Sequence, residues 1–254
     1  MRTARQVYDS IAKQYDYDNS PSPEILQLLF SKALEYKRPV NALDVCCGTG
    51  THSIPLAKSI PSIRLTGIDV SKKMLEKARG KMPGAQWVQG DFFFTDIASR
   101  AYDLVMAIHC LHLINWKQFV LRCNRIVSEL GQVFIVTGDR QDYSNIYYNF
   151  IPQLKDADLL HYPRVRQLRA QFEQQGFETK AQHLTLIHTI ADKEDVEKLV
   201  NRALNKTNAL FHLVPQESLA NQALKMKQDL LSQLKNATIQ HKETLYAIHA
   251  KRKR

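Results

Sequence analysis

Long hydrophobic runs are missing from this chain of 254 residues. No window approaches the roughly 20 apolar residues that a membrane-spanning helix requires. The opening MRTARQVYDS contains basic residues but no apolar core after them, so we expect no secretory signal. The length allows one large domain, or one domain with a substantial insertion. We therefore expect a cytoplasmic protein without a membrane span.

Cysteine is scarce as well, with four residues at Cys46, Cys47, Cys110 and Cys123. They form neither a Cys-x-x-Cys pair nor a His/Cys ladder of zinc-ligand spacing, so we predict no metal site. Adjacent cysteines rarely bridge each other, and we expect all of them to be small, buried and reduced. A reactive thiol at Cys46 or Cys47 is the alternative.

Acidic residues are fewer than basic ones, which gives a formal net charge of +10. Such a surplus can indicate nucleic acid or an anionic substrate. The surplus is spread, however, since residues 1–140 contain 18 basic and 13 acidic side chains and residues 141–254 contain 17 and 12. Part of the second surplus is the terminal KRKR. We interpret the charge as a solvated surface and expect no nucleic-acid partner.

Short apolar runs alternate with helix-like segments in the first half of the chain. The expected strands are PVNALDVCC, IRLTGIDV, AQWVQGD, YDLVMAIHCL and QVFIVTGD. Helices are expected at GTGTHSIPLAKSI, capped by Thr51 or Ser53, at SKKMLEKARGKM, capped by Ser71 and ended by Gly80, and at WKQFVLRCNRIVSEL, closed by Gly131. This alternation predicts an α/β fold with a doubly wound, parallel sheet.

The second half contains two more expected strands and two segments that depart from the alternation. RVRQLRAQFEQQGFETKAQHLTLIHTI predicts a helix, a glycine stop and a strand, and KETLYAIHAKRK predicts a closing edge strand. No internal repeat or low-complexity linker divides the chain. We predict one domain, residues 1–254, with its core in 38–140, 164–190 and 241–252 and insertions at 141–163 and 192–240.

A glycine turn and strand-end acids mark a binding site in the first half. Ligands of open α/β sheets bind at the carboxyl ends of the strands. Gly48 and Gly50 follow the first strand and let the main chain approach a ligand closely. Asp69 ends the second strand, where a carboxylate can accept both hydroxyls of a ribose. Asp91 follows the third strand, where its carboxylate can accept a hydrogen bond from the exocyclic amine of an adenine. Asp44 lies at the end of the first strand.

Two absences argue against a phosphorylated ligand. The turn is Gly-Thr-Gly followed by Thr51 and His52, without the third glycine that brings helix and pyrophosphate together in NAD sites. The sequence also contains no GxxxxGK[ST] phosphate loop. The ligand is therefore expected to be a nucleoside without phosphates.

Four segments, LDVCCGTG, LTGIDVSKKMLEKAR, WVQGDF and YDLVMAIHCLHLI, resemble in order and spacing the motifs of class I S-adenosylmethionine-dependent methyltransferases. The likeness covers about residues 7–137, and the leading VYDSIAKQYD is similar to the ubiquinone/menaquinone-type and related small-molecule branches. The family pattern has a glycine where Cys46 stands, but the turn is expected to rely more on Gly48 and Gly50. The resemblance implies a Rossmann-like, seven-stranded, mostly parallel sheet with an antiparallel last strand, helical insertions that form a substrate cap, and S-adenosyl-L-methionine as cofactor.

The resemblance also implies roles for individual residues. The cofactor contacts would be Asp44, Cys46, Gly48 and Gly50 along the methionine, Asp69 at the ribose, Val70, Met74, Asp91 and Phe92 at the adenine, Ile108 and His109 near the methyl group, and Tyr15. A lid formed by residues 1–36 would carry Tyr15 over the cofactor and Tyr8 toward the acceptor. Packing on a helix face is the alternative for both tyrosines.

His109 is the candidate general base, because it follows the fourth strand beside the expected methyl group. The alternative is a histidine that only lines the pocket. His112 and His52 are weaker candidates. With an antiparallel last strand, both insertions would roof the site, and Tyr143, Tyr147 and Tyr148 would line it for an apolar or planar acceptor. Phe150 and Tyr162 belong to the same expected lining, for which core packing is the alternative.

The acceptor is expected to be a small organic molecule. IHCL occupies the place where base-amine methyltransferases have [DN]PP[YF], and no RNA-binding module is present. We predict O-, N- or C-methylation of a small acceptor, in secondary metabolism or quinone-like chemistry, by a monomer or homodimer. An RNA or protein methyltransferase and a non-methylating S-adenosylmethionine-binding protein are the alternatives.

Overall fold

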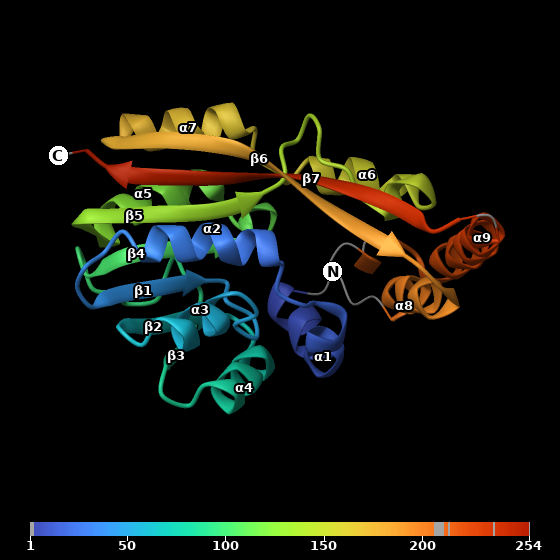
Figure 1. Cartoon of the computed structure of the whole chain (residues 1–254), viewed down its shortest axis with the longest axis horizontal. Coiled ribbons are helices and arrows are strands. Elements are labelled where there is room, and N and C mark those ends of the chain that lie inside the picture. Colours follow the sequence, from blue (N-terminus) through green and yellow to red (C-terminus); the bar gives the residue numbers. More distant parts are fainter. Residues whose placement is uncertain (1–2, 206–210, 213, 236, 254) are drawn as a thin grey trace.

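A seven-stranded sheet forms the centre of the computed structural model, which describes residues 3–205, 211–212, 214–235 and 237–253 (Figure 1). Its strands are β1 (Val40–Val45), β2 (Ile63–Asp69), β3 (Gln86–Gln89), β4 (Tyr102–Ile108), β5 (Val127–Thr137), β6 (Phe177–Ile190) and β7 (Ile239–Arg252). The order is β3-β2-β1-β4-β5-β7-β6, and β7 runs antiparallel to both of its neighbours. This confirms the predicted fold class, including the antiparallel last strand.

The last strand was expected at the edge of the sheet, and that expectation is wrong. β7 lies between β5 and β6, and β6 is the edge strand. Ile248 and Ala250 of β7 are fully buried, because helices cover both faces of the sheet at this position. The alternation of apolar and polar residues in KETLYAIHAKRK therefore does not mark an exposed edge.

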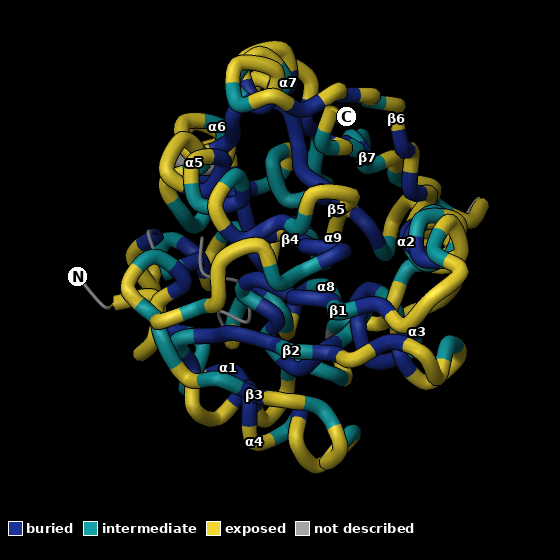
Figure 2. The backbone as a smooth tube through the Cα atoms, turned by 90° about the vertical axis from the view of Figure 1, so that its left-hand side faces the viewer, coloured by how far each residue is buried: buried dark blue, intermediate teal, exposed yellow. Residues whose placement is uncertain are grey.

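Helices cover both faces of the sheet, as the doubly wound prediction requires. α2 (Pro23–Ala33), α3 (Ser53–Ser59) and α4 (Lys72–Lys81) contribute to one buried core, and α5 (Trp116–Ile126) and α7 (Val165–Gln174) contribute to the other. Successive residues of β1 and β4 enter alternate cores, which follows from the two-residue period of a strand. Figure 2 shows the strands as buried and the outer turns of the helices as exposed.

Three local predictions about helix ends are wrong. α5 ends at Ile126 instead of Leu130, because the buried, β-branched Val127 begins β5. α4 continues through Gly80 to Lys81. Neither Thr51 nor Ser53 caps α3, which begins after His52 without a side-chain cap, whereas Ser71 caps α4 as predicted and accepts from Met74 N.

Strands β6 and β7 extend well beyond the rest of the sheet. Thr137, the last residue of β5, pairs with Tyr246, which pairs with His183. Residues 184–190 and 239–245, here called the ribbon, therefore continue past the carboxyl ends of the parallel strands by about 20 Å at the usual rise of a strand. Figure 1 shows the ribbon reaching α8 (Lys193–Leu204) and α9 (Gln216–Leu234).

The segments predicted as insertions share a core of their own. α6 (Pro152–Leu159), α8 and α9 pack together through Leu154, Val200, Met226 and neighbouring apolar residues. α1 (Ala4–Asp18) packs separately against α4 through Ile11, Ala12 and Met74. Of the helices in the described part of the chain, none has the length and apolar character needed to cross a membrane. The carboxyl edge of the sheet is thus enclosed by α1 on one side and by the ribbon and its helices on the other.

Candidate functional site

The turn after β1 bends through three left-handed residues. Cys46 and Gly48 have φ of 54° and Gly50 has φ of 74°. Both glycines adopt the left-handed conformation that they allow without strain, and Cys46 adopts it as well, which is uncommon for a residue with a side chain. A Cβ at Gly50 would lie 2.6 Å from Ile54 Cδ1, so this glycine allows α3 to pack against the turn. A Cβ at Gly48 would meet nothing nearer than Tyr15 Cε1 at 4.0 Å, which leaves open space over the turn.

The Asp69 carboxylate joins the turns after β1 and β2. One oxygen accepts from Gly48 N and the other from Ser71 N, each at 2.8 Å. Burial raises the pKa of Asp69, and the backbone N–H groups of Ser71, Gly48 and Val70 oppose the rise. A carboxylate can accept about four hydrogen bonds, so Asp69 keeps acceptor capacity for a ribose hydroxyl.

Asp44 is a second buried acid beside the turn, with 5% of its surface exposed. Burial raises the pKa of Asp44 to about 7, and the Asp69 carboxylate adds to the rise. The Ser53 hydroxyl lies nearby, is itself buried, and has no hydrogen bond of normal geometry. Acid and hydroxyl together form a polar corner suited to an ammonium or another hydrogen-bond donor.

The raised pKa predicts a stability effect for Asp44→Asn in the ligand-free protein. The folded state disfavours ionisation of Asp44, so wild-type stability is lost as pH rises from the ordinary carboxyl range through about 7. We expect the variant's advantage in unfolding free energy to grow over this interval and to be constant at higher pH. Urea unfolding of both proteins across the interval measures it. Asp96→Asn, at an exposed acid, should show no such trend.

Helix α1 is attached to this region by polar contacts. Ser71 Oγ donates to Asp9 Oδ1 at 2.6 Å, Thr49 Oγ1 donates to Asp16, and Lys81 Nζ lies 3.0 Å from Asp16 Oδ1. Burial raises the pKa of Tyr15 to about 12 and that of Tyr8 above its usual range, with the Asp69 charge contributing to both. Tyr15 Cε1 stands 4.0 Å from the Cβ position of Gly48, over the turn, and both rings also pack against the core of α1 and Met74, as the helix-face alternative expects.

The predicted adenine contacts are in different environments. Val70 is half-buried, and Asp91 is exposed and accepts from Phe93 N at 2.8 Å. Met74 is fully buried against α1. The Phe92 ring is 3% exposed, with the Phe119 ring centroid at 5.7 Å and the Arg122 guanidinium at 5.2 Å. Neither Met74 nor Phe92 offers a free side-chain surface to a ligand in this arrangement.

His109 follows β4, where its N–H donates to Val136 O at 2.9 Å and its φ is 55°. Its ring centroid lies 6.1 Å from that of His52, whose Nε2 accepts from Ser22 N at 3.2 Å. Burial lowers the pKa of His52 to about 3 and lowers that of His109 as well. The His109 side chain is exposed to solvent at the carboxyl end of β4. Ile108 beside it is half-buried.

The ribbon adds polar residues that the sequence analysis missed. Glu243 Oε1 accepts from Tyr143 OH at 2.9 Å, and its Oε2 lies 3.0 Å from His188 Nε2. Burial alone would raise the pKa of Glu243, but His188, His109 and Tyr143 together lower it. His241 stands opposite His188 in the strand pairing, and its buried Nε2 has no partner. The signal was the alternation in HKETLYA, which places His241, Glu243 and Leu245 on one face.

The predicted aromatic lining divides into two groups. Tyr143 packs over Gly138, and its ring centroid lies 4.6 Å from Tyr162 and 6.0 Å from Tyr148. Of these rings, Tyr143 reaches the Glu243 carboxylate through its hydroxyl, and Tyr143 and Tyr162 are buried members of the core, which favours the core-packing alternative for both. Tyr147 instead donates to Leu199 O at 3.1 Å and meets Phe211 edge-on, and Phe150 packs in the same core with α6, α8 and α9. This position favours a structural role for Tyr147 over contact with an acceptor.

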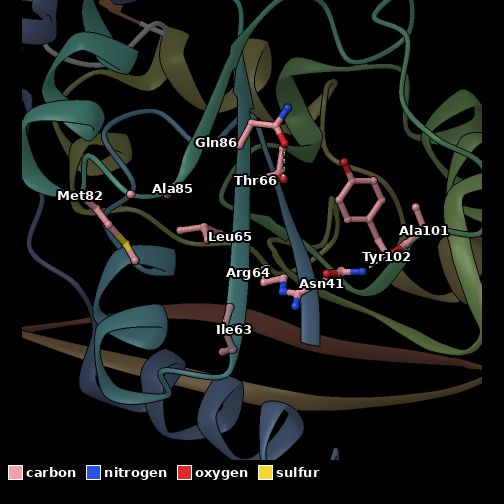
Figure 3. Close-up of a pocket in the computed structure, with 11 residues that line it drawn as sticks. Asn41, Ile63, Arg64, Leu65, Thr66, Met82, Ala85, Gln86, Ala101 and Tyr102 are labelled. Carbon is pink, nitrogen blue, oxygen red and sulfur yellow. Dashed lines mark hydrogen bonds between the residues drawn. The ribbon is translucent and has the colours of Figure 1, made fainter. Parts of the chain in front are cut away.

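A groove of about 440 Å³ lies at the opposite edge of the sheet from these residues, at the amino ends of β1 to β4 (Figure 3). Its lining includes Asn41, Arg64, Thr66, Gln86 and Tyr102, and no carboxylate or histidine is among the described residues that line it. The reactive groups named above are thus gathered at the carboxyl edge instead. Within the described ranges, no three His, Cys, Asp or Glu side chains are grouped as a metal site would require.

Comparison with known proteins agrees with this geometry. Residues 42–131 match a family model described as a methyltransferase domain. A demethylmenaquinone methyltransferase of Staphylococcus aureus is 24% identical over 202 residues, covering 68% of this chain and 83% of that protein. An Anabaena variabilis protein, described as a methyltransferase from an antibiotic biosynthesis pathway, has a TM-score of 0.73 at 18% identity, covering 91% of this chain and 98% of that one.

A second solved structure covers the whole of both chains. It is a S-adenosylmethionine-dependent methyltransferase from Thiobacillus denitrificans in complex with S-adenosyl-L-homocysteine, with a TM-score of 0.61 at 13% identity and 100% coverage of each chain. At such identities the likeness to solved structures shows the fold, in which the turn after β1 and the end of β2 meet at the carboxyl edge of the sheet.

Proposed function

We propose that this chain, an S-adenosylmethionine-dependent methyltransferase, transfers the methyl group to a small organic acceptor bound between His109 and the ribbon. The observation that supports this most is the open space over Gly48 beside a buried carboxylate with acceptor capacity to spare. A nucleoside fits there without a phosphate site. The cofactor supplies a methyl group already activated by a sulfonium.

Residues of this chain would hold the cofactor from three sides. Asp69 would accept the ribose hydroxyls, and the corner formed by Asp44 and Ser53 would take the amino group of the methionine part. Tyr8 and Tyr15 would close over it from α1, excluding water from the methyl group. Aligning the attacking atom with the methyl carbon can supply roughly 7–11 kcal/mol of the barrier reduction.

The acceptor class is proposed from the side chains at this edge of the sheet. Tyr148 is half-buried and provides apolar ring surface, the rings of Tyr143 and Tyr162 are buried behind it, and His109 is an exposed polar group. Similarity to a demethylmenaquinone methyltransferase and to an antibiotic-pathway protein supports secondary metabolism or quinone-like chemistry. We propose a cytoplasmic enzyme, monomeric or homodimeric, with residues 1–36 as lid and 141–163 and 192–240 as cap. No feature of the described residues favours the RNA, protein or non-methylating alternatives.

Calorimetry with two ligands tests the proposal. S-adenosyl-L-homocysteine should bind the purified protein with one site per chain, and NAD should not compete for that site, because the turn lacks the third glycine that brings helix and pyrophosphate together in NAD sites. Binding of NAD at the same cleft in preference to S-adenosylhomocysteine would contradict the cofactor assignment. Transfer of a labelled methyl group to small hydroxyl- and amine-bearing molecules then separates the acceptor classes.

A further inference from the structure

We propose that Asp9 and Asp16 of α1 are positioning residues that hold the two turns where the cofactor would bind, an inference that rests on the proposed function. The two acids couple the docking of α1 to the binding of S-adenosylmethionine. Neither acid touches the cofactor in this role. Each acts through a hydroxyl group that belongs to one of the two turns.

The sequence of α1 contains a repeat that cofactor contacts alone do not explain. VYDSIAKQYD has one Tyr-Asp pair at Tyr8 and Asp9 and a second at Tyr15 and Asp16. Both pairs lie within the helix, which spans Ala4–Asp18. Seven residues are close to two turns of an α-helix, so each residue of the second pair lies almost directly along the helix from its counterpart. The two acids therefore share one face of α1, and the two tyrosines share an adjacent face.

Asp9 contacts the turn after β2. Ser71 Oγ donates to Asp9 Oδ1 at 2.6 Å, and Lys73 N donates to the same oxygen at 3.2 Å. Ser71 is fully buried, and its own N donates to Asp69 Oδ1 at 2.8 Å. These contacts place Asp9 at the start of α4, where the helix dipole favours a negative charge. One serine thus connects the acid of α1 with the acid proposed to hold the ribose.

Asp16 contacts the turn after β1. It accepts a hydrogen bond from the hydroxyl of Thr49, which is fully buried between the two left-handed glycines of the turn. Lys81 Nζ of α4 lies 3.0 Å from Asp16 Oδ1 and balances part of its charge. Gly48 N, in the same turn, donates to Asp69. The two acids of α1 therefore bind the two turns that the Asp69 carboxylate joins.

The docked position of α1 covers the place where the cofactor would lie. Figure 1 shows α1 beyond the carboxyl ends of β1 and β2, and Tyr15 Cε1 stands 4.0 Å from the Cβ position of Gly48. The apolar cluster between α1 and α4 is small, with Ile11, Ala12 and Met74 as its buried members. A small apolar contact leaves a large share of the docking free energy to the two acids. The cofactor and α1 stabilise the same arrangement of the turns, so each favours the binding of the other.

The first test is the affinity and the dissociation rate of S-adenosylhomocysteine, measured by calorimetry and by surface plasmon resonance. Asp16→Ala and Thr49→Val should each lower the affinity about three- to tenfold, the range for one hydrogen bond, and should increase the dissociation rate. Because these changes remove the two ends of one bond, combining them should cost little more than either alone. Glu76→Ala, at an acid of α4 that pairs with Lys72 at 3.9 Å, is the matched control and should change neither quantity.

Hydrogen exchange of the α1 amides is the second test, because it separates a coupled helix from a merely structural one. In wild type, S-adenosylhomocysteine should slow exchange in α1 as well as at the end of β2. With Asp9→Ala and Asp16→Ala combined, the α1 amides should exchange several-fold faster without ligand, and the ligand should protect β2 but not α1. Asp16→Asn, which keeps an acceptor oxygen for Thr49 and loses the charge, should give an intermediate result.

Unchanged affinity and unchanged α1 exchange in the combined Asp9→Ala and Asp16→Ala protein would overturn the inference, as would fully additive losses in Asp16→Ala and Thr49→Val. If an alanine variant fails to fold, which a thermal scan shows, the nearly isosteric Asp16→Asn and Thr49→Val still decide. Failure of S-adenosylhomocysteine to bind wild type would contradict the proposed function instead. The α1 exchange rates of the ligand-free proteins then still show whether the two acids hold the helix.

Discussion

Asp69→Ala should weaken the binding of S-adenosylhomocysteine by about ten- to a hundredfold, since a lost hydrogen bond to a charged group costs about 1.5–3 kcal/mol and 1.4 kcal/mol is a factor of ten. The Asp69 carboxylate is 9% exposed and already oriented by Gly48 N and Ser71 N. Its unused acceptor capacity needs no rearrangement to receive a ribose hydroxyl. The effect should therefore be a loss of enthalpy on binding, measured by calorimetry.

The control for this experiment must separate binding from folding. Asp69 also ties together two turns, so the thermal midpoint of Asp69→Ala is measured alongside its affinity. Asp96→Ala, at an exposed acid in the segment after β3, should leave the affinity at its wild-type value. Unchanged affinity in a folded Asp69→Ala protein would contradict the ribose assignment, and a nucleoside would then have to bind elsewhere on the carboxyl edge.

The parts of the site that could be predicted from the sequence are those whose position depends only on nearby residues in the chain. Asp44, Asp69 and His109 each follow a short apolar run, and parallel strands bring their carboxyl ends to one edge of the sheet. Ser71 caps α4 through its own backbone neighbours. Such features depend on residues a few positions apart, so one amino-acid sequence is enough to predict them, without knowledge of the tertiary packing.

Glu243 could not be predicted in the same way. Its hydrogen-bond partners, Tyr143 and His188, are 100 and 55 residues away. The alternation of apolar and polar residues around Glu243 predicts a strand. Only the position of β7 between β5 and β6, however, brings residues 239–245 of this strand past the carboxyl edge of the sheet. The helix expected through Leu130 was wrong for a related reason, because Val127 continues the helical pattern yet pairs with Tyr102 of β4.

Cys46 contributes to the turn more than the sequence indicated. A small residue was expected to be compatible there because the turn relies more on Gly48 and Gly50, and Cys46 itself also adopts φ of 54°. All four cysteines are free, and Cys46 is half-buried whereas the other three are buried. The glycine that the family pattern has at this position was the signal for a left-handed residue, and Cys46 keeps that conformation at the cost of backbone strain.

His109→Asn should reduce methyl transfer by roughly 10²–10⁴-fold, the usual contribution of a general base, while the affinity for S-adenosylhomocysteine remains near that of wild type. Asparagine is the appropriate replacement because it tolerates the left-handed conformation that His109 adopts at φ of 55°, so the end of β4 keeps its path. The measurement is kcat/KM for the acceptor as a function of pH, together with calorimetry for the cofactor product.

The pH dependence distinguishes a base from a residue that only lines the site. Burial lowers the pKa of His109, so a base at this position remains unprotonated, and active, to a lower pH than an ordinary histidine with a pKa of about 6.5 would. The wild-type rate should therefore fall only on the acidic side of that value, and His109→Asn should lose this acidic limb along with most of its rate. Equal rates in both proteins would show that His109 only lines the site.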